Sequence, residues 1–438
     1  MSSRGRFGPL VNGPFARLWA AQGLSFIGDQ VFDTTLVVYL AAVLGKGQSW
    51  APLAVAGTFI VIAIPTIVVG PLAGVLVDRT DKRRMLMAMD GLRAVLVIAL
   101  LPALGLLGGP RPPAALQIAA IYAVVFATTV CSQFFSPARI ALVGDIVPEP
   151  ELPQAQSMGQ VNSSVSTILG PPLAVPVLFL LGIQWALIAN ALSFLASLVL
   201  VAFVAAPASA RSTDTGQAPD FIRELREGMV FTFSNHVLRT LLIGLFVVTL
   251  GAGALNALDV FFVIDNLHAP AAQFGFIGAA MGAGVLVGAV LTGAFAQRLG
   301  LDRLYWGSML TMGVLLLIYA RMTTLAGGLA VLFLAGFPQA GANVAVGPML
   351  LKVTPRELVG RVVSVVQPVI TVAGMISTAV AGYLASQVLF GFHAGLGPIT
   401  FGTYDTIFSF AGILLLAGGF YSLIALRGYS APVDSARA

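Results

Sequence analysis

The chain has 438 residues, of which 58% are hydrophobic and only 9% are charged. Soluble globular proteins carry about 25% charged residues, so this composition excludes a soluble protein and predicts one that lies mostly in lipid. We attribute the formal net charge of +5 to basic residues that set the orientation in the membrane. It is no indication of a nucleic-acid partner. Cys131 is the single cysteine, which excludes a disulfide framework and a cysteine-based metal site.

Apolar runs of about 20 residues, the length that crosses a bilayer, follow one another along the chain. Twelve such runs are flanked by charged residues or by Gly and Pro. They lie at about 15–44, 51–77, 85–108, 114–146, 154–181, 184–206, 236–264, 272–298, 304–321, 325–351, 362–389 and 400–426. This pattern predicts an all-α integral membrane protein with twelve transmembrane helices.

The runs form two groups of six. We expect an N-terminal six-helix bundle at 1–206, a cytoplasmic linker at 207–235 and a C-terminal six-helix bundle at 236–438. The first part of the linker is rich in Pro, Ser, Thr and Asp, which is typical of a solvated segment. Its second part places Phe221, Ile222 and Leu225 on one helical face, which predicts a short amphipathic helix on the membrane surface.

Two similar segments lie half a chain length apart. Residues 74–84 read GVLVDRTDKRR and residues 293–303 read GAFAQRLGLDR, and each closes an apolar run at a charged turn. The similarity predicts two pseudo-symmetric halves, an arrangement typical of secondary transporters.

Basic residues indicate the orientation. If the N-terminus is cytoplasmic, all 23 Lys and Arg residues except Lys46, Arg111 and Arg321 lie on the cytoplasmic side. This bias follows the positive-inside rule. We therefore expect both termini to be cytoplasmic, in a multi-pass protein of a bacterial-type cytoplasmic (inner) membrane.

Carboxylates inside apolar runs are candidate binding residues, because a charged group facing lipid costs about 3 kcal/mol or more. Asp29 and Asp33 lie four residues apart in the first helix, so they share a face. Asp259 lies in the seventh helix, with Asn256 three residues earlier. We expect these four residues to bind a cationic substrate or a proton, since desolvation favours the protonated carboxyl. Hydrogen bonding to neighbouring Ser, Thr or backbone groups is the structural alternative.

Four stretches resemble the major facilitator superfamily, within it the drug-exporter-like branch that includes macrolide and siderophore exporters and drug:proton antiporters. They are the 74–83 segment, Phe135–Arg139 followed by Asp145, Gly170-Pro171, and Pro355–Arg361. The resemblance covers nearly the whole chain. It implies the major facilitator fold, with the first and seventh helices lining a central cavity. The superfamily usually has Gly at the position of Asp81, so we expect no positive φ there.

The resemblance also implies roles for charged residues at helix ends. Asp78 would meet the N-terminus of the eleventh helix, near Gly360 and Arg361, and hold an inner gate closed. The other expected gating residues are Arg79, Lys82, Arg83, Arg139 and Asp145, with Arg139 and Asp145 pairing with Lys82, Arg83 or each other. Gly170 and Pro171 would form a hinge. In the third helix, the spacing of Asp90 and Arg93 predicts an ion pair.

Together these features predict a monomeric secondary active transporter, a multidrug-efflux antiporter that exports amphiphilic drugs or other small organic molecules by alternating access. Its partners would be the substrate, membrane lipids and protons, with the proton gradient in place of a cofactor or metal. A lipid or lysolipid flippase, a siderophore or metabolite exporter, and a non-transporting receptor or scaffold are the alternatives. No nucleophile–base pair or metal-ligand cluster appears at mid-depth, so we expect no enzyme.

Overall fold

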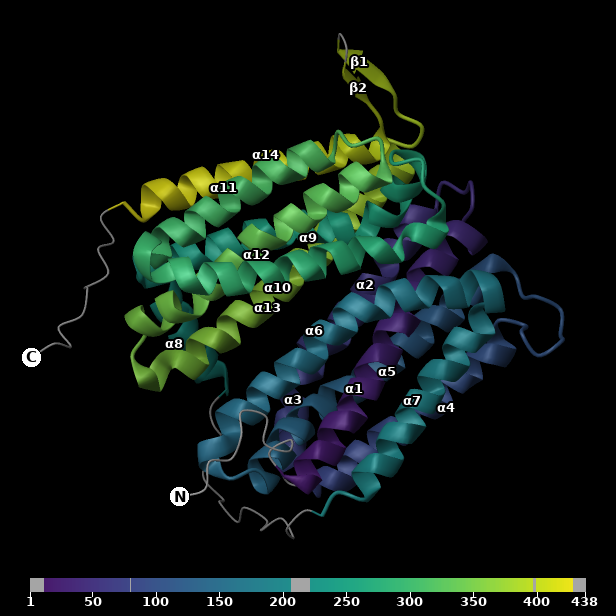
Figure 1. Ribbon diagram of the computed structural model, residues 1–438, viewed down its shortest axis with the longest axis horizontal. Helices are drawn as coiled ribbons and strands as arrows, with labels where there is room; N and C mark the ends of the chain where they lie inside the picture. Colours follow the sequence, from purple (N-terminus) through teal and green to yellow (C-terminus); the bar gives the residue numbers. More distant parts are fainter. Residues whose placement is uncertain (1–11, 79, 206–220, 397–398, 428–438) are drawn as a thin grey trace, which may run out of the picture. The chain divides into compact units, whose positions relative to one another are not determined.

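The computed structural model describes residues 12–78, 80–205, 221–396 and 399–427. Within these ranges, twelve helices are long and apolar enough to cross a membrane, as the apolar runs predicted. The chain divides into two compact units, one of Met1–Asp214 with Ala271–Ala279 and the other of Thr215–Pro270 with Ala280–Ala438. Figure 1 shows each unit as a set of long helices.

The first unit contains the first six spans. Its elements are α1 (Gly13–Val38) continued by the π-helix η1 (Tyr39–Leu44), α2 (Ala51–Val68), α3 (Gly70–Asp78), α4 (Lys82–Ala103), α5 (Ala114–Ile146), η2 (Glu149–Glu151), α6 (Leu152–Pro176), η3 (Val177–Leu181), α7 (Ile183–Ala202) and the short η4 (Ala271–Gln273). A buried apolar cluster that includes Phe15, Leu86, Phe135 and Leu142 packs α1, α4 and α5 together.

The second unit contains the remaining spans. Its elements are α8 (Phe221–Ser234), α9 (His236–Asp265), α10 (Gly275–Leu299) from Ala280 onward, α11 (Leu301–Tyr319), α12 (Leu325–Val353), η5 (Arg356–Leu358), α13 (Val359–Tyr383), η6 (Leu384–Val388), β1 (Ala394–Leu396), β2 (Ile399–Phe401) and α14 (Thr403–Ala425). Leu241, Tyr305 and Met349 belong to one of its buried clusters, which joins α9, α11 and α12.

Each half begins with the same kind of helix cap. The side-chain oxygen of Asn12 accepts the backbone N–H of Phe15 at 2.8 Å at the start of α1. At the start of α9, Asn235 accepts the N–H groups of Val237 and Leu238. Such a cap satisfies amides that have no partner within the helix. The matching caps agree with a repeated plan.

The predicted turn after the second span is confirmed. Asp81 has φ −69° and accepts the N–H of Arg84 at 2.8 Å, so it caps α4 where the superfamily usually has Gly. The second span itself is interrupted between α2 and α3 at Val69. Pro71 lies in the first turn of α3, where a missing N–H costs little.

The glycine-rich eighth span approaches a neighbour closely. A Cβ on Gly284 would lie 2.0 Å from the carbonyl oxygen of Phe333, and a Cβ on Gly288 would lie 2.7 Å from the Cα of Phe337. Only glycine lets the α10 and α12 backbones come so near.

The linker is described only in its second part. A helix predicted at Phe221–Gly228 is confirmed as α8, and it continues to Ser234. The polar segment 206–220 lies outside the described residues. A short antiparallel hairpin, β1 with β2, precedes α14 and was not predicted. It delays the start of the last helix to Thr403 rather than residue 400.

Candidate functional site

The first helix carries its two acids one turn apart in different surroundings. The side chain of Asp29 is 34% exposed and faces α4, where its carboxylate lies 3.8 Å from the guanidinium of Arg93. Asp33 is exposed at the surface of α1. The shared face predicted for the two residues therefore carries one acid that is held by a cation and one that is open to its surroundings.

A buried arginine forms the centre of this site. Arg93 is 3% exposed and donates to Asp90, which is 0% exposed, so the ion pair predicted from their spacing is confirmed. The aromatic rings of Phe135 and Phe194 each lie 4.4 Å from the guanidinium carbon. Cation–π contacts of this kind stabilise a cation that has left water.

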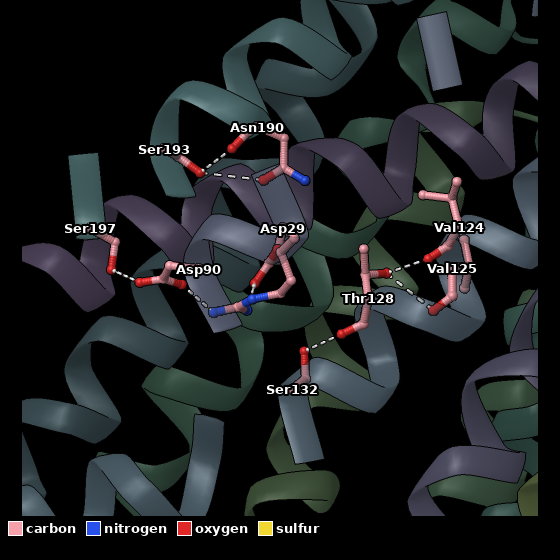
Figure 2. Close-up of polar contacts among 10 residues, drawn as sticks. Asp29, Asp90, Val124, Val125, Thr128, Ser132, Asn190, Ser193 and Ser197 are labelled. Carbon is pink, nitrogen blue, oxygen red and sulfur yellow. Dashed lines mark hydrogen bonds and ion pairs between the residues drawn. The ribbon is translucent and has the colours of Figure 1, made fainter. Parts of the chain in front are cut away.

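Helix α7 completes the polar cluster, as Figure 2 shows. The hydroxyl of Ser197 donates to Asp90 at 2.6 Å. One turn away, Ser193 donates to the backbone and side-chain oxygens of Asn190. A Cβ on Gly28 would lie 2.2 Å from the Ser193 hydroxyl oxygen. Gly28, which precedes Asp29, thus lets these two polar residues reach the first helix.

This arrangement places two carboxylates around one guanidinium. With all three groups ionised, Asp29, Asp90 and Arg93 carry a formal charge of −1 inside a membrane span. Buried charge is costly, so close partners matter here. Asp90 has two donors, Arg93 and Ser197, while Asp29 has one more distant cation.

The second unit holds one buried acid of a different kind. Asp259 is 9% exposed, and the hydroxyl of Tyr319 on α11 donates to its carboxylate at 2.5 Å. The Tyr319 ring packs against Phe262 and Phe408, at 4.8 Å and 6.0 Å between ring centres. Asn256 is exposed instead. The two residues lie three apart in α9, and of the two only Asp259 is enclosed.

The predicted gating residues are found in separate contacts. Lys82 donates to Asp145 at 2.7 Å, joining the start of α4 to the end of α5. Arg83 donates to the carbonyl oxygens of Val201 and Ala202 at the end of α7.

Arg139 contacts α1 instead of the acid at the end of its own helix. It donates to Gln22 at 3.3 Å and lies over the ring of Phe26 at 5.8 Å. In the second unit, Arg361 pairs with Glu227 of α8, and the neighbouring Gly360 is exposed with open space around it.

The remaining predicted positions are those of the inner-gate acid and the hinge. Asp78 ends α3, but its side chain and the whole of Arg79 lie outside the described residues. Gly170 is buried in α6, where a Cβ would lie 2.3 Å from the Cβ of Gln30. Pro171 follows it inside the same helix.

Sequence reasoning missed one contact of Arg93 and the donors Ser197 and Tyr319. It gave Arg93 a partner in its own helix but not Asp29, and it did not select Tyr319 as the donor to Asp259. A basic residue within an apolar run was the available signal for Arg93. No local signal marks Tyr319, which follows a long apolar stretch. In the described part of the chain, no three His, Cys, Asp or Glu side chains gather as a metal site would require.

The chain is similar to bacterial membrane transporters along most of its length. The sequence profile of the family described as transmembrane secretion effector matches residues 4–396. The uncharacterized MFS-type transporter YkuC of Bacillus subtilis is 24% identical over 96% of this chain and 94% of its own. Macrolide efflux protein A of Streptococcus pyogenes is 25% identical over 69% of this chain and 72% of its own.

Solved structures show the same fold. A bacterial homologue of the iron transporter ferroportin, in an inward-facing state, superposes with a TM-score of 0.70, 17% identity and coverage of 95% of this chain and 98% of the other. The nucleoside transporter NupG gives a TM-score of 0.69 at 12% identity, covering 95% of this chain and 100% of its own. The chain therefore belongs to the transmembrane secretion effector family of the major facilitator superfamily and is a multi-pass membrane transporter rather than an enzyme.

Proposed function

We propose that the protein is a proton-coupled exporter of amphiphilic organic molecules, acting as a monomer by alternating access in the cytoplasmic membrane. The observation that carries the proposal is the cluster of Asp29, Asp90 and Arg93 inside the membrane-spanning part of the first unit. Asp33 lies exposed one turn further along the same helix. We infer that Asp29, whose cation lies 3.8 Å away, takes up the proton, and that Asp33 attracts a cationic substrate.

The cluster suggests how a proton would change the protein. When Asp29 is ionised, its attraction to Arg93 holds α1 to α4 across 3.8 Å. Protonation removes that attraction, while Arg93 keeps Asp90 and its two aromatic rings. The contact between α1 and α4 then weakens and that between α4 and α7 remains. A change in one helix contact that follows protonation is what coupling to a gradient requires.

Export as the direction of transport is supported by a relative. Macrolide efflux protein A, by its name, carries macrolides out of the cell. Macrolides are large amphiphilic molecules, and many carry a basic amine. A carboxylate such as Asp33 would attract the protonated amine more strongly in apolar surroundings than it would in water. We therefore infer that the substrates include amphiphilic cations.

A cell assay tests the proposal. The chain is expressed in a bacterial host that lacks its own exporters, and accumulation of radiolabelled erythromycin is measured with and without an uncoupler. We expect the wild type to lower accumulation and the uncoupler to remove the difference. Cells that express Asp29→Asn or Asp33→Asn should accumulate as much erythromycin as cells without the protein. Glu149→Gln, a change in the short η2 helix between two spans, is the control and should export normally.

The outcomes separate the alternatives. Export that survives the uncoupler would contradict proton coupling, and normal export by both aspartate variants would remove the first-helix acids from the mechanism. No flux of erythromycin or of other amphiphilic cations would contradict the proposed substrate class and favour a lipid flippase or a receptor.

A further inference from the structure

Helix α8 carries an open groove along one of its faces. The groove has a volume of about 510 Å³, and its lining residues recur at helical spacing on α8 with one residue from η5: Arg223, Arg226, Glu227, Val230, Phe231, Ser234 and Leu358. Val230, Phe231 and Leu358 are its apolar lining residues, and its two arginines lie nearer the start of α8. We call this feature the α8 groove.

The groove is fixed in place by close packing on α13. A Cβ on Gly228, on another face of α8, would lie 2.4 Å from the carbonyl oxygen of Arg361. The side chain of Arg361 also pairs with Glu227. Because two contacts hold α8 against α13, the position of its arginines relative to η5 is set by the fold.

The charge of the groove is positive. Its single acid, Glu227, lies 3.8 Å from Arg223 and is also held by Arg361 from outside the groove. Arg226 is exposed, and among the described residues no carboxylate lies within ion-pair distance of it. The lining holds two arginines and one carboxylate, and Arg361 adds a third positive charge beside that carboxylate, so the net charge here is positive. A guanidinium group can donate to two oxygens of one phosphate at the same time. A phosphate is therefore the anion that suits this groove.

The groove also lies at the level of the membrane surface. Helix α8 ends at Ser234, two residues before α9 begins, and Leu358 directly precedes α13. Both α9 and α13 are membrane spans, so their first residues mark the edge of the hydrocarbon. Beside Arg226, three apolar side chains are exposed on α8: Met229 at 40%, Val230 at 62% and Phe233 at 50%. An arginine among exposed apolar residues suits the boundary between headgroups and acyl chains.

The end of the second unit that carries the α8 groove also carries most of its basic residues. Of the Lys and Arg residues described in this unit, Arg321 alone lies at the opposite end. The positive-inside rule assigns such an end to the cytoplasmic leaflet, which holds anionic lipids in its surface.

We propose that the α8 groove binds the phosphate headgroup of an anionic phospholipid, with Arg226 and Arg223 on the phosphate and the exposed apolar residues against the first part of the acyl chains. This site is separate from the carboxylate cluster of the first unit and does not depend on the transported substrate.

Native mass spectrometry of the full-length protein in detergent tests the site. Phosphatidylglycerol and phosphatidylcholine with identical acyl chains are titrated separately. For each lipid, the dissociation constant of the first molecule to bind is measured. Arg226→Gln should weaken phosphatidylglycerol binding about fivefold, which corresponds to about 1 kcal/mol for one basic residue at an anionic surface. Val230→Glu, which adds a negative charge to the exposed edge of the groove, should weaken it at least as much. Arg226→Lys should retain most of the affinity.

Arg239→Gln is the matched control, since Arg239 is exposed near the start of α9 and does not line the groove. It should leave the affinity unchanged. The proposal is overturned if phosphatidylcholine binds as tightly as phosphatidylglycerol, or if Arg226→Gln and Arg239→Gln behave alike. It is also overturned if millimolar inorganic phosphate displaces the lipid completely, because the groove would then be a site for a soluble anion.

Discussion

At the scale of single residues, buried charge is the feature that most constrains this protein. Arg93 and Asp90 are almost fully enclosed, and the arginine also serves Asp29. Removing one partner of a buried ion pair leaves the other charge without compensation, which costs about 3–5 kcal/mol. The cluster therefore contributes to folding as well as to the proposed proton binding.

Arg93→Gln should accordingly lower the free energy of unfolding by about 3–5 kcal/mol, because Asp90 and Asp29 lose their cation. Lys82→Gln also breaks an ion pair, but Asp145 is 33% exposed, so the loss of this pair should cost at most about 1 kcal/mol. Denaturant unfolding of both variants in the same detergent measures the difference. Equal losses would show that the Arg93 cluster is not a buried pair.

Tyr319 gives a second test at this scale. Tyr319→Phe removes the donor to a buried carboxylate, and Tyr305→Phe removes a donor to the neutral carbonyl oxygen of Leu241 at 3.0 Å. Hydrogen bonds to charged groups contribute about 1.5–3 kcal/mol and neutral ones about 1 kcal/mol. Tyr319→Phe should therefore destabilise the protein more than Tyr305→Phe. The reverse order, measured by the same unfolding experiment, would show that the Tyr319–Asp259 bond is no stronger than a bond to a neutral carbonyl.

At the residue scale, spacing alone predicted only a pair whose partners lie near in sequence, while the family resemblance supplied the distant pair of Lys82 with Asp145. The spacing of Asp90 and Arg93 was enough to predict their pairing. The contact between Asp29 and Arg93, and that between Asp259 and Tyr319, join different helices more than fifty residues apart. A helical periodicity gives the face of a residue on its own helix, and it does not give the helix that packs against that face.

At the scale of elements, glycines set how near the helices approach. Gly170 of α6 lies directly against Gln30 of α1, at the position expected to act as a hinge. Gly144 of α5 has no neighbour within 4 Å of where its Cβ would be. The two glycines therefore have opposite roles, one in packing and one in an open part of a helix.

Gly170→Ala should destabilise the protein by about 1–3 kcal/mol through overpacking, and it should slow transport if α1 and α6 move against each other. Gly144→Ala should be neutral or stabilising by up to about 1 kcal/mol, because alanine favours the helix where space allows. Thermal unfolding in detergent and erythromycin accumulation in cells measure the two effects. A harmless Gly170→Ala would exclude the close contact.

Element boundaries were predicted well where hydropathy changes sharply. The run at 114–146 coincides with α5, and the run at 325–351 falls within α12. The break between α2 and α3 was missed because no charged residue accompanies Gly70 and Pro71, so the hydropathy stays high on both sides of Val69. Hydropathy locates spans, and it does not detect interruptions within them.

At the scale of the whole molecule, the orientation remains a prediction from the positive-inside rule. It can be tested because Cys131 is the single cysteine and is buried. In a Cys131→Ser background, Arg239→Cys and Lys352→Cys should react with an impermeant maleimide only after the membrane is opened. Lys46→Cys and His393→Cys should react in intact cells. The opposite labelling pattern would place both termini outside.

The central claim is that protons move against the exported molecule. Its most direct measurement uses proteoliposomes of the purified protein with a pH-sensitive dye inside and a gradient of erythromycin across the membrane. The account predicts that erythromycin flux drives protons in the opposite direction, and that Asp29→Asn loses this coupled movement. Erythromycin flux with no change in internal pH, or full coupling by Asp29→Asn, would contradict it.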